Sequence, residues 1–265
     1  MSTEYSEILY MVSGAIARIT LNRPEKRNPL GPRTIGELLH ALDRAKSDAA
    51  VRVVVITGAG KVFSAGGDLS SMGGGGTPLE SGASATTRPG TFVDLNLALV
   101  RLGKPSIAMV NGHALAGGLG LVVACDLALA STEAQLGTPE INVGLWPMMI
   151  MATIFRNVTR KRGLELITTG EKLSAAEAEK IGLITRAVPP AELETAVEAL
   201  AAKLAAKSPK VMALGLDAFH ATEDMELEPA LRLLEQKLVE VLGTNDAREG
   251  LTAFLEKRAP VWTGT

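Results

Sequence analysis

Two glycine-containing segments in the first half of the chain are the strongest candidates for chemistry. They read Phe63-Ser-Ala-Gly-Gly-Asp-Leu69 and Asn111-Gly-His-Ala-Leu-Ala-Gly-Gly118, and each follows a predicted strand. The second also opens a predicted helix, whose first N–H groups lack partners and carry partial positive charge. Two such N–H groups directed at one point would stabilise an enolate or a thioester oxyanion. Glycines in these positions are also compatible with nothing more than tight turns.

Other kinds of reactive site find little support in the sequence. Val53 to Gly60 is a strand followed by a glycine turn, but neither the spaced glycines of a dinucleotide-binding helix nor a P-loop follows it. Ser64 lacks the first glycine of a nucleophile elbow. The three histidines, His40, His113 and His220, are far apart, so no metal site is expected.

The elements around the two glycine segments alternate between strands and helices. Ile8 to Leu21 predicts a hairpin that turns at Ser13-Gly14, and the β-branched run from Val51 to Thr57 predicts a buried parallel strand. Further predicted elements are helices at 34–45, 92–102 and 119–124 and strands at 105–110 and 126–130. This order predicts an α/β fold with largely parallel pairing.

The final third of the chain predicts helices only. Segments 192–206 and 226–242 are amphipathic, and Thr244-Asn-Asp246 is a capping signal for a last helix that ends near Arg258. We therefore expect a core at residues 1–195, followed by a helical region at residues 196–265 that packs against a neighbouring subunit.

Composition is that of an ordinary globular protein. The chain has 265 residues, of which 46% are hydrophobic and 21% charged, with a net charge of −2. This balance argues against nucleic acid or an anionic membrane as a partner. Cys125 is the only cysteine, so no intrachain disulfide is expected, and its apolar surroundings predict burial. The polar start at residues 1–6 and the lack of a membrane-length apolar run predict a cytoplasmic location.

Nearly the whole chain resembles the crotonase (enoyl-CoA hydratase/isomerase) superfamily. The resemblance begins at Ile19-Thr-Leu-Asn-Arg-Pro-Glu-Lys-Arg-Asn28 and includes both glycine segments. It continues through Pro105 to Gly118, Ala124-Cys-Asp126, Pro139-Glu140, Gly182-Leu183 and Glu249-Gly-Leu-Thr-Ala-Phe-Leu-Glu-Lys257. It implies a spiral of β-β-α units and a C-terminal helical oligomerisation region that builds a homotrimer, commonly paired into a hexamer.

The resemblance also implies a substrate and a set of site residues. The substrate is an acyl-CoA thioester, so CoA belongs to the substrate and no separate cofactor is expected. At matching positions, the N–H groups of Gly67 and Gly117 form the oxyanion hole, and Glu140 is one of the family's two catalytic glutamates. The positions that resemble CoA contacts are Arg27 (or Lys26), Ala65, Asp68, Leu69, Phe254 and Lys257, the last two often supplied by a neighbouring subunit.

One departure from the family pattern bears on the reaction. The second glutamate of hydratases falls three residues after the oxyanion-hole glycine, where this chain has Gly120. The leading expectation is still an enoyl-CoA hydratase-like lyase that adds water to a 2-enoyl-CoA. A single glutamate also suits a 3,2-enoyl-CoA isomerase, in which one base moves a proton between C2 and C4. A catalytically weak acyl-CoA-binding homologue is the third alternative.

Two further segments are expected near the acyl group. Gly144-Leu-Trp-Pro-Met-Met149 departs from the glycine-rich family pattern, and we expect Trp146 and the two methionines to reshape the acyl pocket. For the methionines, simple core packing is an equal alternative. Residues 70–90 are rich in glycine, serine and threonine, which fits either an active-site lid or a surface insertion.

Overall fold

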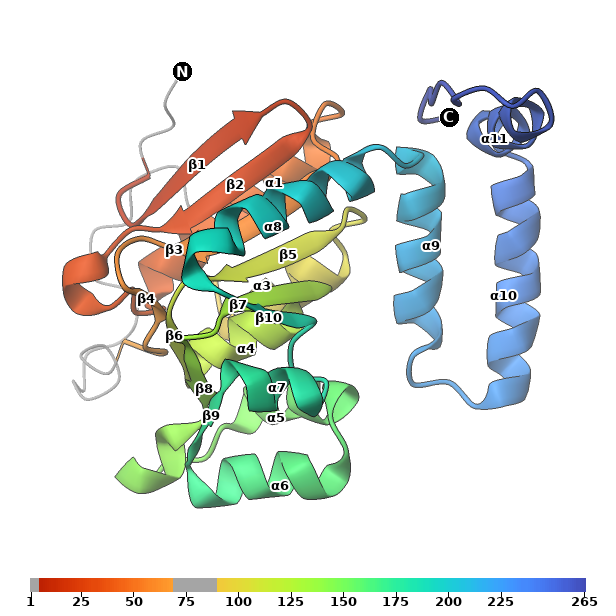
Figure 1. Ribbon diagram of the computed structural model, residues 1–265. Coiled ribbons are helices and arrows are strands. Elements are labelled where there is room, and N and C mark those ends of the chain that lie inside the picture. Colours follow the sequence, from red (N-terminus) through yellow and green to blue (C-terminus); the bar gives the residue numbers. More distant parts are fainter. Residues whose placement is uncertain (1–4, 69–89) are drawn as a thin grey trace.

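The computed structural model describes residues 5–68 and 90–265, and within these ranges the strands form two sheets (Figure 1). The larger sheet has the order β1-β2-β3-β5-β7-β10, formed by Ile8–Ser13, Ile16–Leu21, Val53–Gly58, Ser106–Val110, Leu127–Ser131 and Arg186–Val188. The smaller has the order β4-β6-β8-β9, formed by Val62–Ser64, His113–Leu115, Gln135–Gly137 and Lys172–Ser174. Pairing is antiparallel between β1 and β2 and between β8 and β9, and parallel elsewhere.

A repeated chain path links the two sheets. In the pairs β3–β4, β5–β6 and β7–β8, the first strand joins the larger sheet and the second joins the smaller one. The described helices are η1 Pro24–Lys26, α1 Pro32–Ser47, α3 Phe92–Val100, α4 Gly117–Ala124, η2 Pro139–Val143, α5 Met148–Asn157, α6 Arg160–Thr169, α7 Ala175–Lys180, α8 Pro190–Ala205, α9 Pro209–Thr222, α10 Leu227–Leu242 and α11 Asn245–Leu255. Because each repeat has the same path, the carboxyl ends of β4, β6 and β8 lie along one edge.

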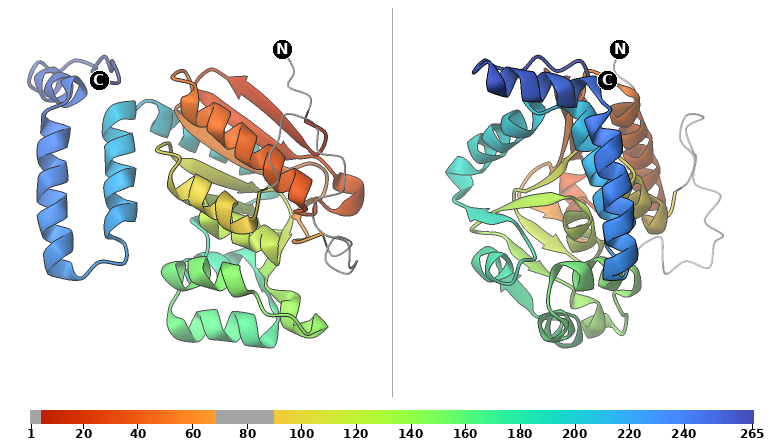
Figure 2. Two further views of the ribbon diagram at one scale, coloured as in Figure 1. Left: turned by 180° about the vertical axis from the view of Figure 1, so that it is seen from behind. Right: turned by 90° about the vertical axis from the view of Figure 1, so that its right-hand side faces the viewer.

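The β3 strand, inside the larger sheet, is buried on both faces, which explains its continuous apolar run. Successive side chains of a strand point to opposite faces. Val54 and Ile56 belong to the main core, which includes α1, α3 and α4, whereas Val53 and Val55 pack in a second cluster with α8. Figures 1 and 2 show α8 on one face of this sheet and α1 and α3 on the other.

The three C-terminal helices extend away from the sheets. Figure 1 shows α9 and α10 as an antiparallel pair beside the body, with α11 across one end of it. The expected boundary between residues 195 and 196 falls inside α8, whose Val197 and Ala201 are fully buried in the second core cluster. The part of the chain that contains the two sheets and their cores, called the body here, therefore ends with α8. The helices that extend from it begin with α9.

Asn28 ties together the segments that precede the smaller sheet. Its backbone has a φ of 52°, in the left-handed region. The side-chain amide donates to the carbonyl oxygens of Ala59 (2.9 Å) and Val62 (2.7 Å), and its Oδ1 accepts from the N–H of Arg23 (2.9 Å). With only 1% of its surface exposed, Asn28 satisfies groups that solvent does not reach.

Replacing Asn28 with alanine should destabilise the protein by about 1–3 kcal/mol, because buried carbonyl oxygens lose their donors. Asn28→Gly loses the same bonds but tolerates the positive φ, so it should be the milder variant by up to about 1 kcal/mol. Urea denaturation followed by tryptophan fluorescence measures both. An Asn28→Ala variant as stable as the parent would show that the network carries no net stabilisation.

Candidate active site

Three neighbouring strand ends bring together the residues that carry the predicted chemistry. Ser64 of β4 pairs with Ala114 of β6, and Leu115 of β6 pairs with Gly137 of β8. Gly67, Gly117 and Glu140 each follow one of these strands by two or three residues. The N–H of Ala116 also donates to the carbonyl oxygen of Gly137 (2.8 Å). The three segments therefore leave the sheet side by side, at the carboxyl edge where parallel sheets commonly bind ligands.

The backbones at Gly67 and Gly117 approach closely. A Cβ placed on Gly117 would lie 3.4 Å from the backbone nitrogen of Gly67, and one on Gly66 would lie 2.6 Å from the Cβ of Ala116. Ala116 itself has a φ of 50° and a ψ of −127°, an unusual conformation for a residue with a side chain. This close approach requires glycine at position 66, whose φ is 102°.

The N–H groups of Gly67 and Gly117 are the predicted donors of the oxyanion hole. Gly117 is the first residue of α4, so its N–H has no acceptor within the helix. Leu30 and Gly67 form an isolated β-bridge. In its bond at 2.8 Å, the N–H of Leu30 donates to the carbonyl oxygen of Gly66, so this bond does not use the N–H of Gly67. Two adjacent backbone donors at a helix start favour an oxygen that develops negative charge.

Ser64 fixes the loop that carries Gly67. Its hydroxyl donates to the carbonyl oxygen of Asn28 (2.8 Å) and accepts from the N–H of Gly66 (3.1 Å). The N–H of Ala65 donates to the carbonyl oxygen of Arg27 (2.9 Å). Ser64 is fully buried, so this loop is held by bonds that water does not compete for.

Glu140 is a partly buried carboxyl group in the short helix η2. Its Oε2 atom is buried and has no hydrogen-bond partner within the described part of the chain. Burial raises the pKa of Glu140 above its ordinary value, and a hydrogen bond from its own backbone opposes this only in part. A carboxyl group with a raised pKa and an unpaired oxygen is suited to proton transfer.

The position one turn beyond Gly117 faces apolar groups. A Cβ on Gly120 would lie 2.7 Å from Cζ of Phe92 and 2.9 Å from Cγ1 of Ile150. Phe92 begins α3 and Ile150 belongs to α5, so both helices converge on α4 here. The space beside Gly120 is therefore filled by an aromatic ring and an aliphatic side chain.

Residues 144–149, which lead into α5 and include its first two residues, are partly exposed. Trp146 packs against the main core and is half-buried. Met148 and Met149 are 64% and 49% exposed, so the alternative that they serve core packing is wrong. Their exposure leaves the expectation of an acyl-pocket role open.

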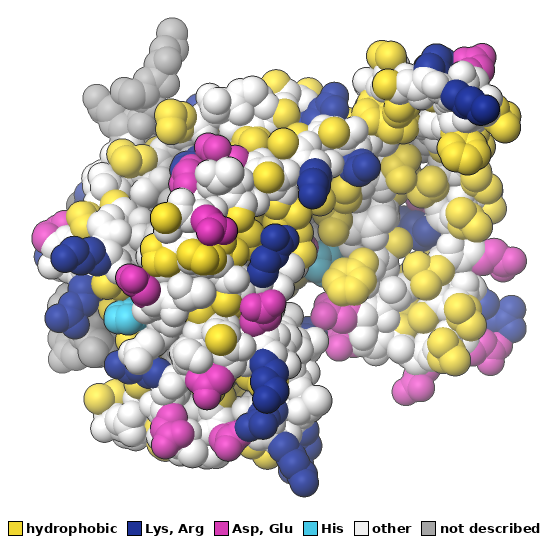
Figure 3. Space-filling view, in the orientation of Figure 1, with side chains coloured by type: hydrophobic (Ala, Val, Ile, Leu, Met, Phe, Trp, Pro, Cys, Tyr) yellow, Lys and Arg dark blue, Asp and Glu magenta, His cyan; other side chains and the backbone are white. Residues whose placement is uncertain are grey.

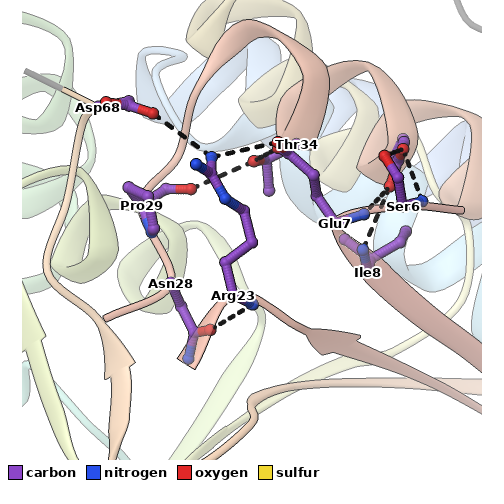
Figure 4. A network of polar contacts seen from close by, with 9 residues as sticks. Ser6, Glu7, Ile8, Arg23, Asn28, Pro29, Thr34 and Asp68 are labelled. Carbon is purple, nitrogen blue, oxygen red and sulfur yellow. Dashed lines mark hydrogen bonds and ion pairs between the residues drawn. The ribbon is translucent and has the colours of Figure 1, made fainter. Parts of the chain in front are cut away.

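Asp68, next to Gly67, joins a polar network that reaches the first strand (Figure 4). The guanidinium of Arg23 lies 3.4 Å from Asp68 and 3.2 Å from Glu7. The single hydrogen of the Thr34 hydroxyl is shared between the Glu7 carboxylate and the carbonyl oxygen of Pro29. Asp68 is thus held in place by an ion pair beside the proposed oxyanion hole.

The remaining predicted CoA contacts lie in two separate regions. Ala65 is half-buried beside the oxyanion glycines, and the side chains of Lys26 and Arg27 are exposed on the neighbouring loop. Leu69 and most of the 70–90 segment, predicted as a lid or an insertion, lie outside the described residues. Phe254 is 81% exposed on α11, which stands apart from the ends of β4, β6 and β8, and Lys257 follows that helix (Figure 1). One chain therefore does not bring Phe254 and Lys257 to the glycine pair.

Residues 5–68 and 90–265 contain no cluster of three His, Cys, Asp or Glu side chains that could hold a metal ion. Among the same residues, no helix is long and apolar enough to cross a membrane.

Comparison with known proteins identifies the family. The model of the enoyl-CoA hydratase/isomerase family matches residues 12–265. The chain belongs to this family. The human enoyl-CoA hydratase domain-containing protein 3, mitochondrial, is 36% identical over 251 residues, which cover 94% of this chain and 80% of that protein. The crotonase resemblance is therefore confirmed.

Solved structures of the family share the fold. The crystal structure of an enoyl-CoA hydratase from Mycobacterium smegmatis has a TM-score of 0.87 and 33% identity, covering 97% of this chain and 99% of that one. The Bacillus anthracis enoyl-CoA hydratase structure has a TM-score of 0.89 and 31% identity, covering 98% of this chain and 100% of that one. The predicted α/β fold with C-terminal helices is therefore confirmed.

Glu140→Gln should raise the melting temperature at pH 7. A raised pKa means that the folded chain holds this proton more tightly than the unfolded chain, so the parent loses stability as pH rises above the unfolded value of about 4.3. Glutamine carries no charge and avoids that loss. The difference between variant and parent should vanish as pH falls towards 4.

Thermal unfolding from pH 4 to 8 measures this difference, with Glu133→Gln at an exposed position as the control. A Glu140→Gln variant that melts below the parent at pH 7 would show that the ionised carboxylate is stabilised in the folded chain.

Proposed function

We propose that the protein is an acyl-CoA enzyme that adds water to a 2-enoyl-CoA thioester. The observation that carries the proposal is the adjacency of the Gly67 and Gly117 backbones at the strand edge from which Glu140 also emerges. The thioester oxygen accepts hydrogen bonds from the two glycine N–H groups, and Glu140 transfers the proton. Membership of the enoyl-CoA hydratase/isomerase family supports this assignment.

The chemistry follows from polarising the thioester carbonyl. Electron withdrawal towards the oxyanion hole makes C3 electrophilic and C2 a proton acceptor. Ionised Glu140 takes a proton from water while the water oxygen bonds to C3, and the π electrons move to the thioester oxygen as an enolate. The protonated Glu140 then returns its proton to C2, which gives the 3-hydroxyacyl-CoA and restores the carboxylate.

The packing around Gly120 specifically favours a second candidate, 3,2-enoyl-CoA isomerisation. Phe92 and Ile150 fill the space where a hydratase carries its second glutamate, so one carboxyl group has to perform every proton transfer. In isomerisation, Glu140 removes a proton from C2 of a 3-enoyl-CoA, and the resulting dienolate is reprotonated at C4. The double bond then lies between C2 and C3, and no water is needed.

The CoA part of the substrate is assigned by position within the family. We place it along Ala65, Asp68 and Leu69, with Arg27 near a phosphate and Trp146 beside the acyl group. Phe254 and Lys257 reach the adenine and phosphates of a neighbouring subunit's substrate. No cofactor besides the substrate's own CoA enters this mechanism. We also propose that the protein acts in the cytoplasm.

Exposed apolar side chains on the C-terminal helices support a homotrimer or hexamer. Along α10, Leu227, Leu231 and Leu238 are 74%, 58% and 57% exposed, and Phe254 and Leu255 of α11 are 81% and 79% exposed. Figure 3 shows hydrophobic side chains gathered over this part of the molecule. Apolar surface of this extent is typical of a protein–protein interface.

A paired assay tests the reaction. Purified protein is given 2-enoyl-CoA and 3-enoyl-CoA thioesters in deuterated water, and products are followed by mass and retention time. Water addition to the 2-enoyl substrate supports hydration, and double-bond migration without water addition supports isomerisation. Glu140→Gln should reduce either activity by about 10²- to 10⁴-fold, because the base is removed and the fold is kept.

Two results would contradict the assignment. Full activity in Glu140→Gln would exclude Glu140 as the proton carrier. Acyl-CoA binding by the parent with no turnover of either substrate would indicate a binding protein of this fold.

Leu231→Glu/Leu238→Glu should reduce the mass of the particle in solution, because charged side chains oppose burial of the α10 face. Light scattering coupled to size exclusion measures the mass at micromolar concentration. The control is Ala199→Glu, at an exposed position of α8, which should keep the parent's mass. A monomeric parent would contradict the proposed oligomer.

A further inference from the structure

The ring of Phe92 lies against Gly120, on the side of α4 that begins at the proposed oxyanion hole. Residues three apart on a helix share a face, so Gly120 follows Gly117 along the same side of α4. At position 120, an added Cβ would meet Cζ of Phe92 at 2.7 Å, Cγ1 of Ile150 at 2.9 Å and Cε1 of Phe92 at 3.2 Å. Contacts below 3.0 Å require a neighbouring group to move. The ring of Phe92 can therefore occupy this place only because residue 120 is glycine.

Local bonds hold Phe92 in this place. It is the first residue of α3, after the N-cap Thr91. The Thr91 hydroxyl accepts from the N–H of Asp94 (3.2 Å), and the Asp94 carboxylate accepts from the N–H of Thr91 (2.8 Å), which forms a capping box. The side-chain amide of Asn96 donates to the carbonyl oxygen of Phe92 (2.8 Å). The backbone that presents the ring is therefore fixed.

Ile150 closes the same space from α5. It is only 5% exposed, and it packs in the main core together with Leu119 and Leu121 of α4. Phe92 is half-buried and packs against the same core. An aromatic and an aliphatic side chain from two different helices thus form one apolar wall, defined here as Phe92 and Ile150.

We infer that the Phe92–Ile150 wall sets the balance between hydration and double-bond migration, because it fills the space on the α4 side of the acyl site that a second carboxyl group and its water would need. This inference rests on the proposed function. Two carboxyl groups divide hydration between them: one takes the proton of the attacking water, and the other gives a proton to C2. With the wall in place, Glu140 performs both transfers, so hydration is slowed relative to double-bond migration, for which a single group suffices.

The wall also explains why a single substitution cannot restore a second glutamate. The Cβ of a glutamate at position 120 would already lie too close to Phe92 and Ile150 whatever its rotamer, so both side chains would have to shift, and crowding of this kind is destabilising. Removing the ring relieves the contacts at 2.7 and 3.2 Å, and only the contact with Cγ1 of Ile150 at 2.9 Å then has to be relieved by a shift. The decisive variant is therefore the double substitution Phe92→Ala/Gly120→Glu.

Four variants test the wall against the parent: Phe92→Ala, Gly120→Glu, Phe92→Ala/Gly120→Glu, and the uncharged control Phe92→Ala/Gly120→Gln. The readout is the ratio of kcat/KM for hydration of a 2-enoyl-CoA to kcat/KM for isomerisation of a 3-enoyl-CoA. We expect the double variant with glutamate to raise this ratio by about 10- to 100-fold, the lower part of the range for an added general base. Gly120→Glu alone and the glutamine control should not raise it.

Two activity results would overturn the inference while the proposed function stands. One is an equal rise in Gly120→Glu and in the double variant, which would mean that Phe92 is no barrier. The other is a folded double variant that still turns over 3-enoyl-CoA at the parent's rate but gains no hydration.

A stability measurement keeps the test independent of turnover. In a double-mutant cycle of melting temperatures, the loss caused by Gly120→Glu should be smaller in the Phe92→Ala background than in the parent, because the clash is relieved. Strictly additive losses of melting temperature would contradict the inference that Phe92 obstructs position 120. A parent that turns over neither substrate contradicts the proposed function, whereas the cycle still reports whether Phe92 and position 120 exclude each other.

Discussion

The close approach of two backbones, at Gly66–Gly67 and Ala116–Gly117, is the constraint around which this molecule is built. It exists because β4 and β6 pair in parallel and leave their sheet together. Gly66 has no side chain to keep the segments apart, and Ala116 adopts a positive φ as α4 begins. The buried hydroxyl of Ser64 and the buried amide of Asn28 hold one side of this contact. Strained or sparsely allowed backbone persists where surrounding structure fixes it in this way.

Two glutamates, Glu37 and Glu140, differ in how their carboxylates are bonded. Glu37 is 5% exposed and accepts hydrogen bonds from the N–H groups of Ser6, Glu7 and Ile8 and from the Ser6 hydroxyl. These bonds fasten the start of β1 to α1. Glu140 is more exposed as a residue, yet its buried Oε2 has no partner in the described ranges. The Glu37 carboxylate is thus committed to structural hydrogen bonds, whereas the unpartnered oxygen of Glu140 is available for the proposed proton transfer.

The parts of this fold that the sequence predicts are those with a long or characteristic pattern. The hairpin at Ser13-Gly14, the buried run of β3 and the Thr244 cap of α11 all have local signals that the structure confirms. The strands β4, β6 and β8 have three residues each, too few for an alternating pattern, and no element was predicted there. The two glycine segments stand out in the sequence. Their close approach in space, however, depends on the pairing of β4 with β6, which has no local sequence signal. Similarly, the sequence shows that position 120 lacks a carboxyl group, whereas the ring of Phe92, 28 positions earlier, is placed there only by tertiary packing.

The exposed leucines of α10 have a consequence for the life of a newly made chain. The body can complete its own cores without the α9–α10 pair, because α8 already covers the outer face of the larger sheet. A newly made, unassembled chain is therefore folded but still exposes the apolar leucines of α10 to solvent. Until that surface is covered, it is open to chaperones, to proteases and to unwanted association with other unfinished chains. For the proposed oligomer, the rate at which chains meet one another, as well as their intrinsic stability, therefore sets how much assembled protein accumulates.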